Sequence, residues 1–293
     1  MLLRETLRQG LKTLLDANIP SPQLAAELLL MHVLGCDRGF LHSHPEARIP
    51  AEAAAKYFRF IGERLTGKPT QYITSHQEFW GLDFEVTPDV LIPRPETEAL
   101  VEGVLELERN EAAGGRRLAA ATSIVDVGTG SGCIALALAW ELPGARLDAV
   151  DISSVALRVA ERNAQRLGLA GRVQFRESDL LSIFLDEKPP RVFDVVVSNP
   201  PYVGRDELDM VQREVREFEP RLAWGELEHA EDVYRRLFPQ ALQLLKPGGR
   251  VAVEIGYKLQ DRVVGLLRDH WQNIEVRPDL AGLPRVVIAQ KPA

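Results

Sequence analysis

The stretch Ser123–Ala139, SIVDVGTGSGCIALALA, joins an apolar run, a glycine-rich loop and a helix-forming segment in direct succession. The apolar run at 123–127 is rich in β-branched residues and is typical of a buried strand. The glycines at 128, 130 and 132 allow the backbone to turn tightly and to approach a ligand closely. A strand, a tight turn and a helix in this order predict one unit of a parallel sheet covered by helices.

The alternation of strand and helix continues toward the C-terminus. Apolar, β-rich runs are separated by segments that carry apolar residues at helical spacing. We therefore expect an α/β fold with a parallel sheet covered on both faces, whose last two strands form an antiparallel hairpin at one edge. The later predicted strands are 146–152, 173–178, 193–198, 250–256, 273–279 and 284–290.

The region before this α/β pattern is different. Leucines recur at helical spacing in residues 3–17, and two further helical segments follow, so the pattern predicts a small helical bundle. Two short strand patterns flank Gly81 and predict a β-hairpin. We expect a helical domain at 1–75, a β-hairpin linker at 76–93 and the α/β domain at 94–293.

Composition limits the class of protein. The 293 residues carry a net charge of −7, which argues against a protein that holds nucleic acid through many phosphates. The two cysteines, Cys36 and Cys133, lie far apart and lack the spacing of metal ligands. The N-terminus does not have a signal-peptide pattern, and no apolar run is long enough to cross a membrane. We expect a cytoplasmic protein with no metal, no membrane contact and no direct nucleic-acid contact.

Three strand ends carry residues that suit a nucleoside cofactor, because ligands bind at the carboxyl ends of parallel strands. The loop Gly128–Gly132 suits a cofactor or a plain strand-to-helix turn, and its spacing fits neither the G-x-G-x-x-G motif nor a P-loop. Asp151 ends the next strand and could accept hydrogen bonds from both ribose hydroxyls or cap the following helix. Asp179 and Leu180 could bind an adenine amino group and ring, although Asp179 could equally be a solvated loop acid.

The fourth strand ends in the turn Asn199-Pro200-Pro201-Tyr202. The two prolines stiffen the turn, so little backbone entropy is lost on binding. The Asn199 side chain offers a carbonyl acceptor beside the free carbonyl of Pro200, and two adjacent acceptors suit a planar NH₂ group. Tyr202 can stack on a flat amide or base. The turn therefore predicts a site that holds an amino group while its nitrogen attacks an electrophile.

In this order the segments resemble class I S-adenosylmethionine-dependent methyltransferases that act on amino groups, a family with a Rossmann-like sheet. Asn-Pro-Pro-Tyr is shared by enzymes that methylate adenine N6 in DNA or RNA and by enzymes that methylate glutamine. The whole chain resembles the peptide chain release factor N5-glutamine methyltransferases, because the DNA enzymes lack the helical N-terminal domain and IPRPETE. The segments that carry this resemblance are PTQYI (69–73), EFWG (78–81), VLIPRPETE (90–98), VDVGTGSGCIALALA (125–139), SNPPYV (198–203), EPRLA (219–223), LKPGG (245–249) and EIG (254–256).

The resemblance implies a reaction and its partners. S-adenosyl-L-methionine would give its methyl group to the glutamine N5 of the Gly-Gly-Gln motif in release factors and leave as S-adenosyl-L-homocysteine. The N-terminal helices would dock this protein substrate, and we expect a monomer. The resemblance assigns cofactor binding to Gly128, Thr129, Gly130, Ser131, Gly132, Asp151, Asp179, Leu180 and Asn199, substrate binding to Asn199, Pro200, Pro201 and Tyr202, and catalysis to Asn199, Pro200 and Tyr202.

One segment departs from the family pattern. After Glu-Pro the family has a glycine-rich stretch, whereas residues 222–232 read LAWGELEHAED, with two of the expected glycines missing. This difference leaves the shape of a loop near the substrate open. The alternative function is adenine-N6 methylation of DNA or RNA, which the turn permits and which the acidic charge disfavours.

Overall fold

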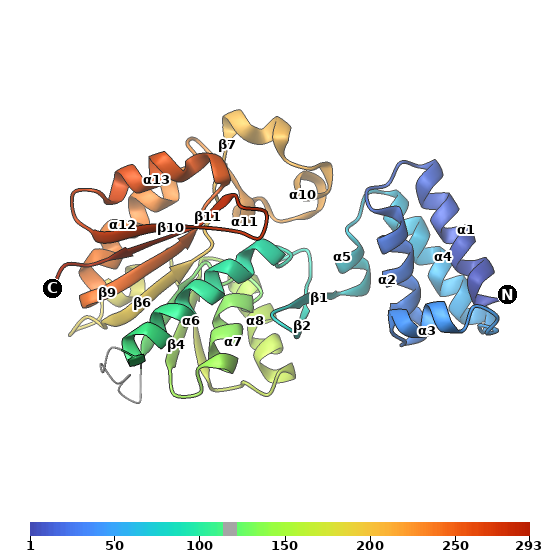
Figure 1. Cartoon of the computed structure of the whole chain (residues 1–293), viewed down its shortest axis with the longest axis horizontal. Coiled ribbons are helices and arrows are strands. Elements are labelled where there is room, and N and C mark those ends of the chain that lie inside the picture. The colour runs from blue at the N-terminus through green and yellow to red at the C-terminus, as the bar shows by residue number, and fades with distance from the viewer. Residues whose placement is uncertain (114–121) are drawn as a thin grey trace. The chain divides into compact units, whose positions relative to one another are not determined.

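The computed structural model describes residues 1–113 and 122–293, which form two compact units (Figure 1). The smaller unit comprises Met1–His76 together with Gln212–Phe218. The larger unit comprises Gln77–Val211 and Glu219–Ala293. In the part of the chain that is described, no helix combines the length and the apolar character needed to cross a membrane.

The smaller unit is helical, as the sequence predicts. Leucines of its first, second and third helices form a core with Tyr57 of the fourth helix, which is fully buried. A Cβ at Gly10 would lie 2.0 Å from the Tyr57 hydroxyl oxygen, so this glycine allows the first and fourth helices to pack closely. The helices are α1 (Leu3–Asp16), α2 (Pro22–Leu34), α3 (Arg38–Ser43), α4 (Ala51–Leu65), α5 (Thr70–Thr74) and α10 (Arg213–Phe218).

The return of the chain to this smaller unit was not predicted from sequence. The helix α10 follows the Asn-Pro-Pro-Tyr turn in sequence, yet it belongs to the N-terminal unit. The buried guanidinium of Arg64 forms an ion pair with Glu214 of α10, and it also donates to the Lys68 carbonyl oxygen at 3.2 Å. A buried arginine with two partners holds this short helix in place.

The larger unit is built on a seven-stranded sheet in the order β10-β11-β9-β6-β3-β4-β5. The strands β5, β4, β3, β6 and β9 run parallel, and β11 and β10 are added antiparallel at one edge, which confirms the expected edge hairpin. The strands are β3 (Ser123–Val127), β4 (Arg146–Asp151), β5 (Val173–Glu177), β6 (Phe193–Ser198), β9 (Leu245–Glu254), β10 (Gln272–Pro278) and β11 (Pro284–Gln290).

Helices cover both faces of this sheet (Figure 1). In β6, Val195 and Val197 pack into the core on one face and Val196 into the core on the other, as the two-residue period of a strand requires. Both faces are therefore apolar, which explains the continuous β-branched run. The first face carries α6 (Glu98–Ala113), α7 (Cys133–Glu141) and α8 (Ser154–Arg166), and the second carries α9 (Ser182–Leu185), α12 (Asp232–Leu244) and α13 (Gln260–Leu267).

The predicted hairpin consists of β1 (His76–Phe79) and β2 (Leu82–Glu85). Phe79, Leu82 and Phe84 are buried in the core between the sheet and its first layer of helices. The Asn163 side chain of α8 accepts from the Glu85 backbone N–H at 2.7 Å and donates to the Glu85 carbonyl oxygen at 3.0 Å. The hairpin is thus part of the packed core of the larger unit.

Strand order reverses beside β3, because β4 and β5 follow on one side of it and β6 is added on the other. In open α/β sheets, ligands bind outside the carboxyl ends of the strands at such a switch point. Both the glycine loop after β3 and the Asn-Pro-Pro-Tyr turn after β6 lie at this edge, since Val127 pairs with Ser198.

Candidate active site

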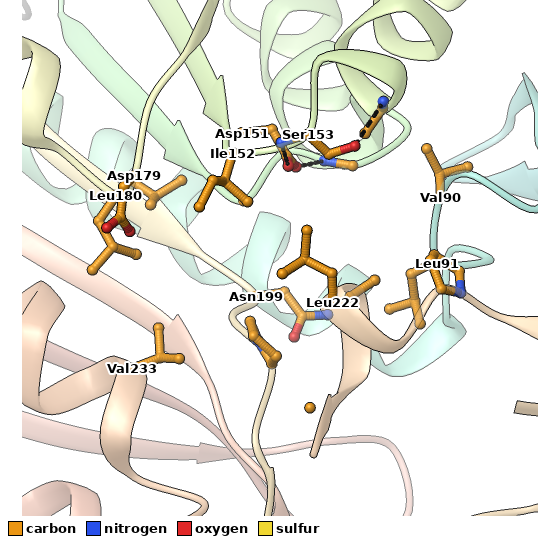
Figure 2. A pocket seen from close by; sticks show the side chains of 18 of the residues that line it. Val90, Leu91, Asp151, Ile152, Ser153, Asp179, Leu180, Asn199, Leu222 and Val233 are labelled. Carbon is orange, nitrogen blue, oxygen red and sulfur yellow. Dashed lines mark hydrogen bonds between the residues drawn. The ribbon is translucent and has the colours of Figure 1, made fainter. Parts of the chain in front are cut away.

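A pocket of about 270 Å³ opens at the carboxyl ends of the parallel strands (Figure 2). It brings together residues from all four predicted strand ends. The same pocket is also lined by Asp89, Val90, Leu91, Pro220, Leu222, Ala223, Gly225 and Leu227. The predicted residues that line it are Gly128, Gly130, Asp151, Asp179, Leu180, Asn199 and Pro201, and those absent from its lining are Thr129, Ser131, Gly132, Pro200 and Tyr202.

The glycine loop faces the pocket with its backbone. Gly128 and Gly130 have φ angles of 73° and 55°, which L side chains rarely adopt. A Cβ at either position would meet no atom within 4 Å, so both glycines border open space. The Gly128 N–H donates to the Val150 carbonyl oxygen at 2.8 Å, which fixes the start of the loop on β4.

The alternate residues of the loop point into the protein and support it. Thr129 is buried and its hydroxyl donates to the Asp126 carboxylate at 2.6 Å, while burial raises the pKa of Asp126 to about 7. Ser131 is also buried. A Cβ at Gly132 would lie 3.0 Å from the Ala160 Cβ, so this glycine allows α7 to pack on α8. These three residues shape the loop from behind.

Asp151 lies at the end of β4, and both of its carboxylate oxygens already accept backbone hydrogen bonds. Oδ2 accepts from the Gly130 N–H and Oδ1 from the Ser153 N–H, each at 2.9 Å. The cap of α8 is Ser153, whose hydroxyl oxygen accepts from the Ala156 N–H at 3.2 Å. Burial raises the pKa of Asp151, and the backbone donors oppose that effect. Each oxygen keeps a further lone pair for a ligand hydroxyl.

The third strand end is Asp179-Leu180, which forms one wall of the pocket (Figure 2). Asp179 is half-exposed and forms an ion pair with Arg236 of α12. Leu180 has a φ of 53°, a left-handed conformation that is strained for a leucine. The next N–H, of Leu181, donates to the Gln240 side-chain oxygen at 2.9 Å, so α12 holds this turn in place.

The Asn-Pro-Pro-Tyr turn places Asn199 in the pocket wall (Figure 2). Its Nδ2 donates to the Thr97 hydroxyl oxygen at 3.1 Å. Pro200 is buried, and within residues 1–113 and 122–293 no donor reaches its carbonyl oxygen. Tyr202 is packed against the core, and its hydroxyl donates to the Glu254 carboxylate at 3.3 Å. Burial raises the pKa of Tyr202.

Two polar residues behind the turn were not predicted as site residues. Thr97 belongs to the 3₁₀ turn η1 (Pro95–Thr97), and its hydroxyl donates to Glu254 Oε2 at 2.6 Å. Glu254 ends β9 and is 1% exposed, and burial raises its pKa to about 7. The only signals in the sequence are the motifs RPETE and EIG, which do not reveal that the two residues meet.

A third unpredicted residue, Glu219, joins two segments that line the pocket. It is buried, forms an ion pair with Arg94, and its Oε2 accepts from the Ile92 N–H at 3.3 Å. Trp224 donates through its indole N–H to the Glu219 carbonyl oxygen at 3.3 Å. Glu219 thereby holds the pocket wall at 89–91 against the segment that begins at Pro220.

The atypical loop of residues 222–232 starts inside this wall. It contains the end of α11 (Arg221–Trp224) and β8 (Gly225–Leu227), which pairs in parallel with β7 (Val203–Gly204) directly after the turn. Gly225 has a φ of 141°, and a Cβ there would lie 2.4 Å from the Val203 carbonyl oxygen. The one glycine kept at this point is therefore required for the strand pairing.

The chemistry of the pocket fits a nucleoside that carries an extended tail. Asp151 has free lone pairs for ribose hydroxyls, Ile152 and Leu180 offer apolar surface for a base, and the glycine loop leaves room for a tail. Asn199 lies at the same cavity. The acceptor turn and the surfaces that suit a nucleoside thus border one cavity.

Comparison with known proteins gives two matching family models. The model described as the PrmC N-terminal domain matches residues 5–74, and the model described as the methyltransferase small domain matches residues 115–227. The first corresponds to the helical region and the second to the region that contains the glycine loop and the Asn-Pro-Pro-Tyr turn.

Curated relatives match over the full length. A protein of Koribacter versatilis named release factor glutamine methyltransferase is 50% identical over 292 residues, which cover 100% of this chain and 99% of that protein. A protein of Moorella thermoacetica with the same name is 42% identical and is matched over 99% of both chains.

Solved structures agree on the fold. The catalytic domain of hMettl16, determined in complex with an RNA hairpin, has a TM-score of 0.55 and a sequence identity of 16%, with 79% of this chain and 81% of that chain covered. At this identity the similarity concerns the fold alone.

Proposed function

The chain belongs to the release factor glutamine methyltransferases, and we propose that it methylates the side-chain amide nitrogen, N5, of the glutamine in the Gly-Gly-Gln motif of peptide chain release factors. One observation carries the proposal: Asn199 and Pro201 of the acceptor turn line the same pocket as the glycine loop and Asp151. A full-length relative of that name at 50% identity supports the choice of substrate.

We assign the methyl donor to this pocket as S-adenosyl-L-methionine. Gly128 and Gly130 would hold its methionine part, Asp151 its ribose hydroxyls, and Asp179 and Leu180 its adenine. When bound, it supplies a methyl group activated on a sulfonium, and S-adenosyl-L-homocysteine is the product. Thr129, Ser131 and Gly132 would act on the cofactor indirectly, through the shape of the loop.

The turn would activate the substrate mainly by position. An amide nitrogen is a poor nucleophile, and no histidine lines the pocket among the described residues. Asn199 Oδ1 and the Pro200 carbonyl oxygen would accept the two amide hydrogens and align the nitrogen. Both acceptors bind more strongly as the nitrogen gains positive charge, which favours the transition state. Pro201 and Tyr202 would complete the glutamine pocket.

We propose that the helical domain at 1–75 docks the release factor, with 76–93 as the connecting hairpin and 94–293 as the catalytic domain. We also propose a monomer that acts in the cytoplasm, where release factors work, without a metal ion and without direct contact with nucleic acid.

A swap assay tests the substrate class. Purified chain and S-adenosyl-L-methionine with a labelled methyl group are incubated in parallel with unmethylated release factor, duplex DNA and ribosomal RNA. We expect label on the release factor alone, and none with the Asn199→Ala variant. Label on DNA or RNA with none on the factor would overturn the proposal in favour of adenine-N6 methylation.

A further inference from the structure

Behind the acceptor turn lies a buried carboxylate that the mechanism above does not use. In the sheet, Val253 of β9 pairs with Ser198 of β6, so Glu254 lies at the level of Asn199. Glu254 is 1% exposed, and its two oxygens accept hydrogen bonds from different segments: Oε2 from the Thr97 hydroxyl at 2.6 Å and Oε1 from the Tyr202 hydroxyl at 3.3 Å. A buried carboxylate held in this way organises its donors.

The Thr97 hydroxyl can satisfy its two neighbours in only one arrangement while Glu254 is ionised. An ionised carboxylate has no hydrogen to give, so Thr97 must donate its single hydrogen to Glu254. Only lone pairs of the Thr97 oxygen then remain for Asn199, and these must accept a hydrogen. The atom of Asn199 that lies 3.1 Å from Thr97 therefore has to be the donor Nδ2.

This arrangement leaves Asn199 Oδ1 as the free acceptor. Within residues 1–113 and 122–293, no donor pairs with Oδ1, and Asn199 lines the pocket. With the opposite amide orientation, an NH₂ group would face the NH₂ group of the substrate, and two donors cannot bond to each other. The orientation of one amide thus decides whether the turn can hold an amide substrate.

We propose that Thr97 and Glu254 are positioning residues that fix the Asn199 amide with Oδ1 toward the substrate, while Glu254 also holds Tyr202 on the other arm of the turn. The proposal rests on the proposed function for its substrate. The hydrogen-bond relay itself, from Glu254 through Thr97 to Asn199, involves only residues of the protein. It gives RPETE and EIG, two motifs without a contact to the pocket, a joint role at the acceptor turn.

Other groups around Glu254 bear on its charge. Burial raises its pKa to about 7, while the Thr97 hydrogen bond, the positive charge of Arg285 and the Tyr202 hydrogen bond oppose that rise, and Glu96 adds to it. Tyr234 of α12 donates to the Glu254 backbone carbonyl oxygen at 2.7 Å and leaves the carboxylate free for Thr97 and Tyr202. The arrangement should therefore be unique above neutral pH, whereas in acid a protonated Glu254 can also donate to Thr97 and no longer fixes the Asn199 amide.

The test uses the side-chain amide signals of the full chain labelled with ¹⁵N-asparagine. The chain has five asparagines, and the Asn199→Ala variant identifies the signal of Asn199. Asn163 is an internal reference, because its Nδ2 donates to the carbonyl oxygens of Glu85 and Ser131 at 3.0 and 2.9 Å. We expect Thr97→Val to shift the Asn199 NH₂ signals and Thr97→Ser to keep them near those of the wild type.

The matched control is Thr122→Val. Thr122 also donates to a buried glutamate, Glu108, at 3.0 Å, but it lies at the opposite end of β3 from the pocket. Thr97→Val should lower kcat with release factor about tenfold to a hundredfold, the effect expected when a reacting group is misplaced. Thr97→Ser should restore it, and Thr122→Val should leave both kcat and the Asn199 signals unchanged. KM and the Kd for S-adenosyl-L-methionine should change by less than about threefold.

Asn199 signals that do not respond to Thr97→Val, or a Thr97→Val enzyme with the kcat of the Thr122→Val control, would overturn the proposal. If Thr97→Val does not fold, Thr97→Ala takes its place: it also removes the hydroxyl that joins Asn199 to Glu254, so it should shift the Asn199 NH₂ signals, and signals like those of the wild type would count against the relay. If the wild type methylates no release factor, the proposed function fails, while the amide signals still confirm or overturn the relay.

Discussion

The glycine loop after β3 and the Asn-Pro-Pro-Tyr turn after β6 end neighbouring strands, yet they build the site in opposite ways. In the loop, Gly128 and Gly130 face the pocket with backbone, and the side chains of Thr129 and Ser131 are buried behind it. In the turn, the side chain of Asn199 lines the pocket itself. One strand end presents its main chain and the other presents a functional group.

The difference lies in what each region needs for support. The loop is held by partners nearby in sequence, because the Thr129 hydroxyl bonds to Asp126 three residues away and the Gly130 N–H donates to Asp151, 21 residues away on the next strand. The turn depends on segments far along the chain: Thr97 is separated from Asn199 by 102 residues. The backbone site is therefore supported by the strand and helix that follow it directly, whereas the oriented side chain of Asn199 needs a partner from a distant segment.

Asn199→Ala should separate the roles of the turn and the loop most clearly. Loss of one of the two acceptors should lower kcat about a hundredfold to a thousandfold, the range for a lost transition-state hydrogen bond. The Kd for S-adenosyl-L-methionine should change by less than about threefold, because the loop is intact. Single-turnover kinetics and calorimetric titration measure the two effects separately. Equal losses in kcat and in affinity for S-adenosyl-L-methionine would mean that the turn also binds the cofactor, and that the loop and the turn do not have separate roles.

The loop should respond to Gly132→Ala through packing. The new Cβ would lie 3.0 Å from Ala160 at a φ of 83°, so close contact and backbone strain add up. We expect a loss of about 2–4 kcal/mol in unfolding free energy together with weaker binding of S-adenosyl-L-methionine. Gly168→Ala is the matched control, since Gly168 has a φ of 71° with nothing within 4 Å. Urea unfolding of both variants tests this prediction, and equal losses would rule out a packing role for Gly132.

The turn should respond to pH through Glu254. Its carboxylate form holds Thr97 as a donor, so kcat should fall as the pH drops below about 7. Glu254→Gln should remove this acid limb and resemble the acidic wild type at every pH, with kcat about tenfold lower at pH 8. A pH–rate profile of both forms checks this, and a limb that persists in Glu254→Gln must come from another group.

Stability should change in the opposite direction. The folded pKa of Glu254 is raised from 4.5 to about 7, so its contribution to stability is complete below pH 4.5 and is lost as the pH rises through 7. Asp126 has a raised pKa with the same sign, so the contribution of Glu254 is the difference between the wild type and Glu254→Gln. Unfolding free energies at pH 5 and 8 give this difference.

The smallest expected effect is that of Tyr202→Phe. The ring and its packing remain, and only the 3.3 Å hydrogen bond to Glu254 is lost, while Thr97 still holds the carboxylate. We expect kcat to fall about twofold to fivefold. Tyr257→Phe, at an exposed tyrosine, is the control and should have no effect. A loss as large as that of Asn199→Ala would mean that Tyr202 acts directly on the substrate.

Much of this fold could be predicted from the sequence because its signals are local. The alternation of strand and helix, the edge hairpin of β10 and β11 and the family resemblance were read from contiguous segments, and they are confirmed. The pocket also gathers residues from all four predicted strand ends. Parallel strands bring their carboxyl ends to one edge, so a linear motif at each end is enough to locate the pocket.

The features that sequence reasoning missed depend on distant contacts. The bond between Thr97 and Glu254 spans 157 residues. Glu219 and Arg94 are separated by 125 residues, and the return of α10 to the smaller unit has no local signal. A periodic pattern reports which face of an element is buried, but it does not report which polar groups meet there.

The most direct measurement is tandem mass spectrometry of the release factor after reaction with S-adenosyl-L-methionine whose methyl group is labelled. Our account predicts one added methyl group on the side-chain amide of the glutamine in the Gly-Gly-Gln motif, and none after reaction with Asn199→Ala. A methyl group on any other residue, or the same yield from Asn199→Ala, would contradict the claim that this turn holds the glutamine amide for methylation.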